Sequence, residues 1–168
     1  LVIVTPAPPG TQHGNPTTAL RSARHLRALG HTVSVLVEWD GRNADAIEQY
    51  FTAMELVEDT APLMMNLINV LAEERRYQEA VNTAENLVKV APSANAYERL
   101  GWCEFRLAEY SKSVHAYREA VKLDDQHWQS WNGIGVNAIN TWLLSKKRDT
   151  VAGAEARDAF RRSLRINP

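Results

Sequence analysis

The sequence predicts a mainly α-helical protein, an α-solenoid of stacked helix–turn–helix units, preceded by a short segment of a different kind. Two observations lead to this prediction. From Gly41 onward, small and large apolar residues return with a period of about 34 residues, which leaves room for two helices and a turn in each period. Residues 1–40 instead contain two short, apolar, β-branched runs separated by a loop rich in proline and glycine.

The clearest unit covers residues 94–127. Its small residues, Gly101 and Ala120, alternate with the bulky Leu100 and Tyr117, so that each bulky side chain has a notch to enter. The same pattern returns one period earlier and one period later. The units predicted in this way are a half repeat at 42–60 and full repeats at 61–93, 94–127 and 128–168. We therefore expect a domain over 42–168 with seven helices and no strand after residue 60.

This pattern of small and aromatic residues resembles the tetratricopeptide repeat (TPR), a helix–turn–helix unit that stacks on copies of itself. The resemblance covers about residues 41–168 and predicts a TPR-like α-solenoid of three and a half repeats. It implies a concave groove, lined by the first helix of each repeat, that binds an extended peptide or a protein partner. The family's groove positions fall here on Asn66, Asn69, Glu98, Trp102, Phe105, Arg106, Asn132 and Asn140.

These groove residues offer two kinds of contact. Asparagine amides can grip a peptide backbone through a donor and an acceptor, while Trp102 and Phe105 offer apolar contact. For both aromatic residues, packing against a neighbouring repeat is the alternative to ligand contact. Chaperone-binding members of the family clamp a carboxylate, but here only Asn69 matches the clamp. The other clamp positions hold Met65, Arg99, Gln129 and Gly133. Binding of the carboxylate that chaperone-binding members clamp is therefore not expected.

The last repeat carries an insertion, because Ala156 arrives about nine residues late. We expect a first helix lengthened by about two turns and a loop at residues 149–153. The basic run 146–148 then lies on a solvated helix end, and an anion site is the alternative.

Residues 1–41 predict a strand, a loop, a helix and a second strand. The runs 1–4 and 32–37 are the strands; Asn15 caps the helix, Pro16 opens it and Gly30 ends it. Two parallel strands without neighbours make a poor sheet, so this segment is expected either to pack on the exposed face of residues 44–57 or to be poorly ordered.

The loop of this segment carries Gly10, Gly14 and Asn15 in front of a helix N-terminus, where backbone N–H groups can hold a phosphate. Its spacing matches neither the dinucleotide fingerprint nor the P-loop, and a tight turn that starts the helix is the alternative. The stretches IVTPAPPG, Gly14-Asn15 and EWDG resemble the N-terminus of GT-B glycosyltransferases of the selenosugar synthase type in selenoneine biosynthesis.

This second resemblance implies that Gly14 and Asn15 lie beside substrate, and it supplies an alternative function. The protein would then be a fragment of a nucleotide-sugar-dependent glycosyltransferase with a TPR appendage. We expect no glycosyl transfer by this chain, because the second domain that grips the nucleotide sugar is absent. A natural fusion and a truncated or misassembled reading frame both remain open, and the opening Leu1 predicts a piece of something longer.

Composition excludes several other functions. The net charge is −1, which gives no general attraction to nucleic acid, and no apolar run reaches the roughly 18 residues that span a membrane. The single cysteine, Cys103, favours a reducing, cytoplasmic location and is expected to be inert. The five histidines show no metal-ligand spacing. We therefore expect a non-enzymatic protein without cofactor or metal, without nucleic-acid or membrane partners, and of undetermined oligomeric state.

Overall fold

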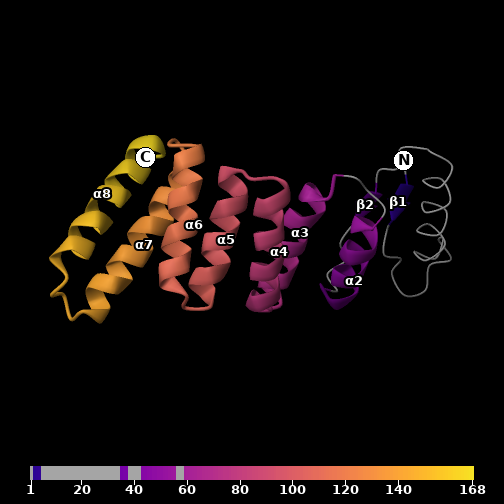
Figure 1. Ribbon diagram of the computed structural model, residues 1–168, viewed down its shortest axis with the longest axis horizontal. Coiled ribbons are helices and arrows are strands. Elements are labelled where there is room, and N and C mark those ends of the chain that lie inside the picture. Colours follow the sequence, from indigo (N-terminus) through magenta and orange to yellow (C-terminus); the bar gives the residue numbers. More distant parts are fainter. Residues whose placement is uncertain (1, 5–34, 38–42, 56–58) are drawn as a thin grey trace. The chain divides into compact units, whose positions relative to one another are not determined.

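The computed structural model describes residues 2–4, 35–37, 43–55 and 59–168 (Figure 1). The chain divides into two compact units, residues 1–75 and 76–168, and each is described by itself. The first unit contains strands β1 (Val2–Val4) and β2 (Val35–Val37) and helices α2 (Asn43–Met54) and α3 (Ala61–Glu73). The second contains helices α4 (Tyr77–Val90), α5 (Ala94–Arg106), α6 (Tyr110–Leu123), α7 (Trp128–Leu144) and α8 (Thr150–Ile166).

These seven described helices confirm the predicted helical region, and residues 61–168 contain no strand. The half repeat at 42–60 holds α2, and each full repeat holds a pair: α3 with α4, α5 with α6, and α7 with α8. The domain boundary expected near residue 41 stays a prediction. The division into compact units falls at another place, inside the repeat 61–93.

The first unit shows both predicted strands. β1 and β2 pair in parallel, with Val2 opposite Val35 and Val4 opposite Val37. β2 also contacts α2, which packs against α3 and buries Ile47, Tyr50 and Ala53. The helix expected after Asn15 lies outside the described residues, as do Gly10 and Gly14.

The second unit is an open stack of helices. Each helix from α4 to α8 packs against the next one along the chain, and α5 also contacts α7 (Figure 1). The first helices of the two complete repeats in this unit therefore lie side by side. Capping fixes where two of the helices begin: the Ser93 hydroxyl accepts from Ala96 N at 3.2 Å, and Asp149 Oδ1 accepts from Ala152 N at 2.9 Å.

Tyr117 of α6 joins the two repeats, because its ring enters glycine notches in both α5 and α7. A Cβ atom placed at Gly101 would lie 3.1 Å from the Tyr117 ring and from the Ser113 carbonyl oxygen. A Cβ atom at Gly133 would lie only 2.4 Å from the ring. The close approach predicted at Gly101 is confirmed. The tighter notch at Gly133 was not predicted.

The turn of the last repeat differs from the prediction. α7 ends at Leu144 and α8 begins at Thr150, so the loop expected at 149–153 is wrong. Asp149 caps α8, and Gly153 lies inside that helix, where its missing Cβ makes room for the Trp142 ring. α7 has 17 residues against 13 in α5, a lengthening of about one turn rather than two.

The basic run 146–148 lies in this turn instead of on a helix end. Lys146 and Lys147 both adopt left-handed backbone conformations, with φ of 53° and 64°. All three basic residues are exposed.

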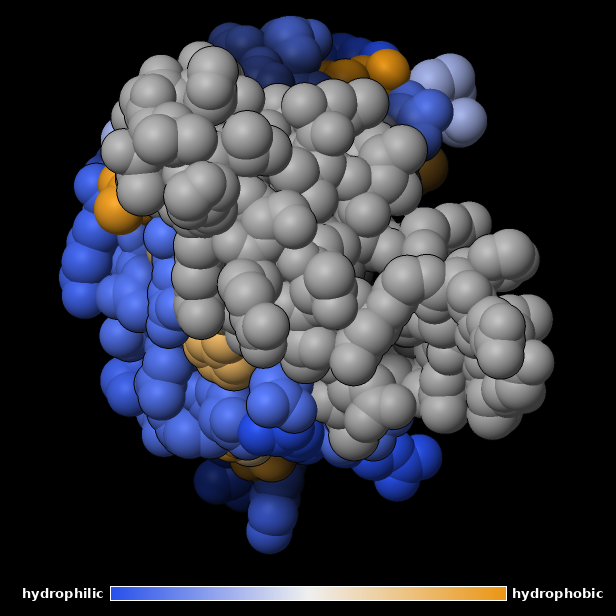
Figure 2. Space-filling view, turned by 90° about the vertical axis from the view of Figure 1, so that its right-hand side faces the viewer, coloured by the Kyte–Doolittle hydropathy of each residue, from blue (hydrophilic) through white to orange (hydrophobic). Residues whose placement is uncertain are grey.

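The described surface seen in Figure 2 is mainly hydrophilic, with single apolar residues rather than one continuous patch.

Candidate functional site: a groove between α5 and α7

A groove of about 360 Å³ lies between the first helices of the last two repeats. It brings together five of the predicted groove residues: Glu98, Trp102, Phe105, Arg106 and Asn132. Its remaining lining residues are Tyr117, Trp128, Gln129, Gly133, Val136 and Asn137. The groove thus has aromatic walls and amides or charged groups within its lining.

The structure does not bring the other predicted residues into this groove. Asn140 lies on α7 and is half-buried, but it is not among the lining residues. Asn66 and Asn69 are exposed on α3, in the other compact unit. Gly10, Gly14 and Asn15 lie outside the described residues, so the glycosyltransferase resemblance stays a prediction.

Arg106 is held in place by two aromatic side chains. Its guanidinium carbon lies 4.7 Å from the ring centroid of Tyr77 and 5.4 Å from that of Trp102, and it donates a hydrogen bond to the Tyr77 hydroxyl. The two rings meet edge to face, 6.1 Å apart. Within the described part of the chain Arg106 has no acidic partner, so an exposed, oriented cation stands at the groove.

Trp102 therefore takes part both in packing between repeats and in the wall of the groove. It packs against Tyr77 of α4, which is a contact between neighbouring repeats, and it also lines the groove. Its ring is half-buried, so one part remains accessible to a ligand. The two alternatives considered for this residue are compatible.

Glu98 places a carboxylate in the groove wall. Only 16% of its side chain is exposed, and one carboxylate oxygen lies 3.5 Å from Arg99 Nε. Burial raises the pKa of Glu98, while the charges of Arg99 and His127 oppose that rise. The Glu98 carboxylate is thus a hydrogen-bond acceptor that is mostly shielded from water.

His127 ties the start of α7 to α5 beside this carboxylate. The His127 ring is buried, with Nε2 at 2.8 Å from Asn95 Oδ1 and Nδ1 at 2.9 Å from Ser130 Oγ. Both ring nitrogens are therefore engaged, which fixes the spacing between the two helices that form the groove.

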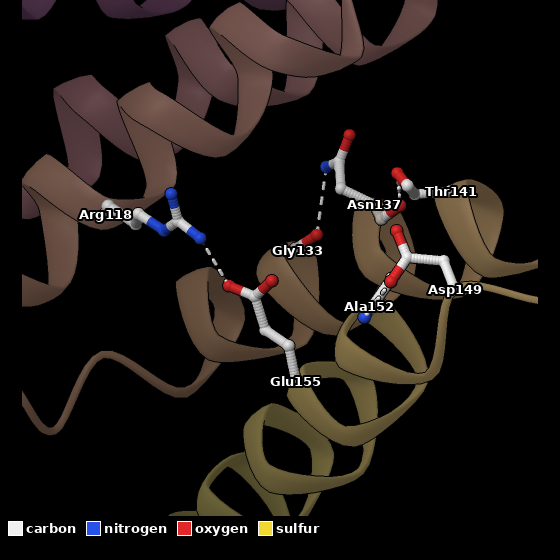
Figure 3. A network of polar contacts seen from close by, with 7 residues as sticks. All are labelled: Arg118, Gly133, Asn137, Thr141, Asp149, Ala152 and Glu155. Carbon is white, nitrogen blue, oxygen red and sulfur yellow. Dashed lines mark hydrogen bonds and ion pairs between the residues drawn. The ribbon is translucent and has the colours of Figure 1, made fainter.

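A chain of buried hydrogen bonds joins the three helices around the groove. Asn137 Nδ2 donates to the Gly133 carbonyl and to Ser113 Oγ, both at 3.0 Å, and Ser113 Oγ donates to the Gly101 carbonyl at 2.7 Å. Figure 3 shows the amide nitrogen of Asn137 directed at Gly133. Asn137 Oδ1 is buried and has no hydrogen-bond partner among the described residues. These bonds fix α5, α6 and α7 relative to one another.

Sequence reasoning missed Asn137, Tyr117 and Trp128 as groove residues. Asn137 is buried within α7, and Tyr117 belongs to the second helix of its repeat, whereas the predicted groove positions all lie on first helices. A signal for Asn137 was present, since it is a polar residue three positions after the apolar Ile134, on the same side of α7.

The described residues offer little support for metal binding, cysteine reactivity or membrane insertion. They contain no cluster of three or more His, Cys, Asp or Glu side chains that could hold a metal ion. Cys103 is buried, and burial raises the pKa of its thiol to about 12, so it stays protonated and unreactive, as expected. No described helix is both long and apolar enough to cross a membrane.

The model of the family "Tetratricopeptide repeat" matches residues 65–127. Among curated proteins, small glutamine-rich tetratricopeptide repeat-containing protein 2 of Mycosarcoma maydis is 25% identical over 143 residues, covering 83% of this chain and 40% of that protein. Human tetratricopeptide repeat protein 33 is 33% identical over 66 residues, covering 39% of this chain and 25% of that protein. The chain thus spans less than half of either relative.

Solved structures share the fold. MamA of Desulfovibrio magneticus RS-1 superposes with a TM-score of 0.61 at 18% identity, covering 90% of this chain and 77% of that chain. YrrB, described as a TPR protein with an unusual peptide-binding site, gives a TM-score of 0.62 at 14% identity, covering 90% and 69%. Together with the observed helix pairs, these matches identify residues 65–127 as tetratricopeptide repeats and the fold of the helical region as TPR-like.

Proposed function

We propose that this chain is a protein-interaction module whose groove between α5 and α7 binds an extended peptide segment of a partner. The observation that carries the proposal is the convergence of Glu98, Trp102, Phe105, Arg106 and Asn132 on one groove. A groove of about 360 Å³ with aromatic walls can take one or two side chains of a peptide. YrrB, which shares the fold, is described as having a peptide-binding site, and this supports a peptide as the class of ligand.

The groove chemistry indicates how such a peptide would bind. An apolar side chain would pack on Trp102 and Phe105, because both rings line the groove and are half-buried. A carboxylate would bind Arg106, which Tyr77 and Trp102 already orient. Asn132 is exposed and offers a donor and an acceptor to the peptide backbone. In this function the chain has no chemistry of its own.

Trp102→Ala tests the proposal. Peptides selected from a random library on the whole chain should bind the variant at least tenfold more weakly, because loss of a central aromatic anchor costs about 2 kcal/mol or more. Thermal melting is measured on the same sample, since Trp102 also packs on Tyr77. Isothermal titration at a temperature where both proteins are folded separates affinity from stability.

A matched control is Trp131→Ala, a change of another half-buried tryptophan that does not line this groove. It should lower stability without changing the affinity for the selected peptides. A folded Trp102→Ala protein that binds the same peptides as tightly as the wild type would remove this groove as the binding site.

A further inference from the structure

The last repeat has a net positive charge, unlike the rest of the chain. Residues 128–168 contain seven Lys and Arg but only three Asp and Glu, a net charge of +4. Because the whole chain has a net charge of −1, the preceding residues sum to −5. A protein that is nearly neutral overall therefore has a cationic C-terminal end.

Part of this charge forms a line along α8. Arg157, Arg161 and Arg165 follow one another at intervals of four residues, so they lie on one side of the helix, about 6 Å apart along its axis. All three are exposed. We name these three residues the arginine row.

The members of the arginine row have no ion-pair partner within the described residues. The other arginines nearby differ: Arg162 pairs with Asp158 at 2.9 Å, and Arg118 of α6 pairs with Glu155 of α8 (Figure 3). The two carboxylates that α8 carries are thus both engaged. Within the part of the chain that the structure describes, α8 has no further carboxylate to pair with the arginine row.

An apolar side chain accompanies the row. Leu164 is 63% exposed and lies three residues after Arg161, on the same side of α8. The small Ala154 is exposed one turn before Arg157 and leaves room for close approach of another backbone. This face thus combines three cations with an apolar contact.

We propose that the arginine row and Leu164 dock an acidic amphipathic helix of a partner protein. Glutamates at intervals of four residues repeat with the same spacing as the three arginines, and an apolar residue between them would meet Leu164. A long polyanion such as nucleic acid, or an anionic bilayer, responds to charge over a large area, and the net charge of the whole chain is −1. A short acidic helix touches only α8, and for this reason the charges favour it.

The test uses the whole chain and a synthetic 16-residue helical peptide with glutamates at positions i, i+4 and i+8 and a leucine beside them. Fluorescence anisotropy at 50 mM NaCl should show saturable binding that weakens at least tenfold at 300 mM NaCl. A peptide of the same composition, with its glutamates spread around the helix, should bind at least tenfold more weakly.

Two triple variants locate the site. Arg157→Glu, Arg161→Glu and Arg165→Glu together should abolish binding of the acidic peptide. The control carries the same charge change at exposed lysines elsewhere, as Lys89→Glu, Lys112→Glu and Lys122→Glu, and should keep most of the affinity. Trp102→Ala should leave this affinity unchanged, so the result is independent of the groove between α5 and α7.

Three results would overturn the proposal. The first is unchanged binding by the folded arginine-row variant. The second is equal binding of the two peptides, which would mean attraction by charge alone. The third is tighter binding of a single-stranded oligonucleotide or of phosphatidylserine vesicles through the same arginines, which would assign this face to a different class of partner.

Discussion

Of the two glycine-to-alanine changes beside the Tyr117 ring, at Gly101 and Gly133, Gly133→Ala should destabilise the protein more. The new Cβ would lie 2.4–2.6 Å from three atoms of the Tyr117 ring, whereas carbon atoms in favourable contact are about 3.5–4.0 Å apart. The ring would have to move by about 1 Å. It is only 5% exposed and also lies against Gly101, so little space is available for that movement.

The expected magnitude follows from two opposing effects. Replacing glycine by alanine inside a helix gains about 0.8–1 kcal/mol of helix propensity. Forcing extra volume into a packed core costs about 1–3 kcal/mol. With the severe overlap at Gly133 we expect a net loss of about 1–2 kcal/mol in the free energy of unfolding, measured by urea denaturation followed by circular dichroism.

Two further variants control for this reasoning. Gly101→Ala, whose Cβ would approach no closer than 3.1 Å, should change stability by less than about 0.5 kcal/mol, because propensity and crowding nearly cancel. Tyr117→Leu should reduce the cost of Gly133→Ala, because the ring that clashes is gone. A Gly133→Ala protein as stable as the wild type would show that the assigned packing of α6 against α7 is wrong.

Two other substitutions should change stability, one at a buried carboxyl group and one at a residue with positive φ. Burial raises the pKa of Glu104 to about 7, and its Oε2 is buried without a hydrogen-bond partner among the described residues. The protein therefore loses stability as the pH rises from about 4.5, the ordinary pKa of this group, to about 7, and the loss is complete above pH 7. Glu104→Gln should then stabilise the protein by about 2 kcal/mol more at pH 8 than at pH 5 in urea denaturation, and a gain independent of pH would contradict this. Ala108, which follows the C-cap residue of α5, has φ of 62°, so Ala108→Gly should raise stability by about 0.5 kcal/mol. The control Ala91→Gly, at the C-cap of α4 with φ of −142°, should lower stability. A loss of stability in both variants would show that the backbone at residue 108 is not strained.

Much of the helical fold could be predicted from residue spacing. Leu100 and Tyr110 have matching residues one period earlier, at Leu67 and Tyr77. Gly101 and Tyr117 have matching residues in the next repeat, at Gly135 and Phe160, and such a period leaves few alternatives to paired helices. Four groove residues on α5 followed from the same register, since a helix of known phase presents known residues to one side.

The repeat pattern of the sequence did not predict which side chains of different repeats contact one another. The notch at Gly133 exists because Tyr117 reaches from α6 to the helix of the next repeat, and the orientation of Arg106 depends on Tyr77, 29 residues earlier. The place of the turn before α8 was decided by the cap at Asp149 and by the packing of Trp142 on Gly153. Local periodicity specifies which face of each helix is apolar, because that depends on neighbours three and four residues away. Which side chain fills which notch, and which charge is left without a partner, depends on residues brought together only when the helices pack, and so only the tertiary structure decided them.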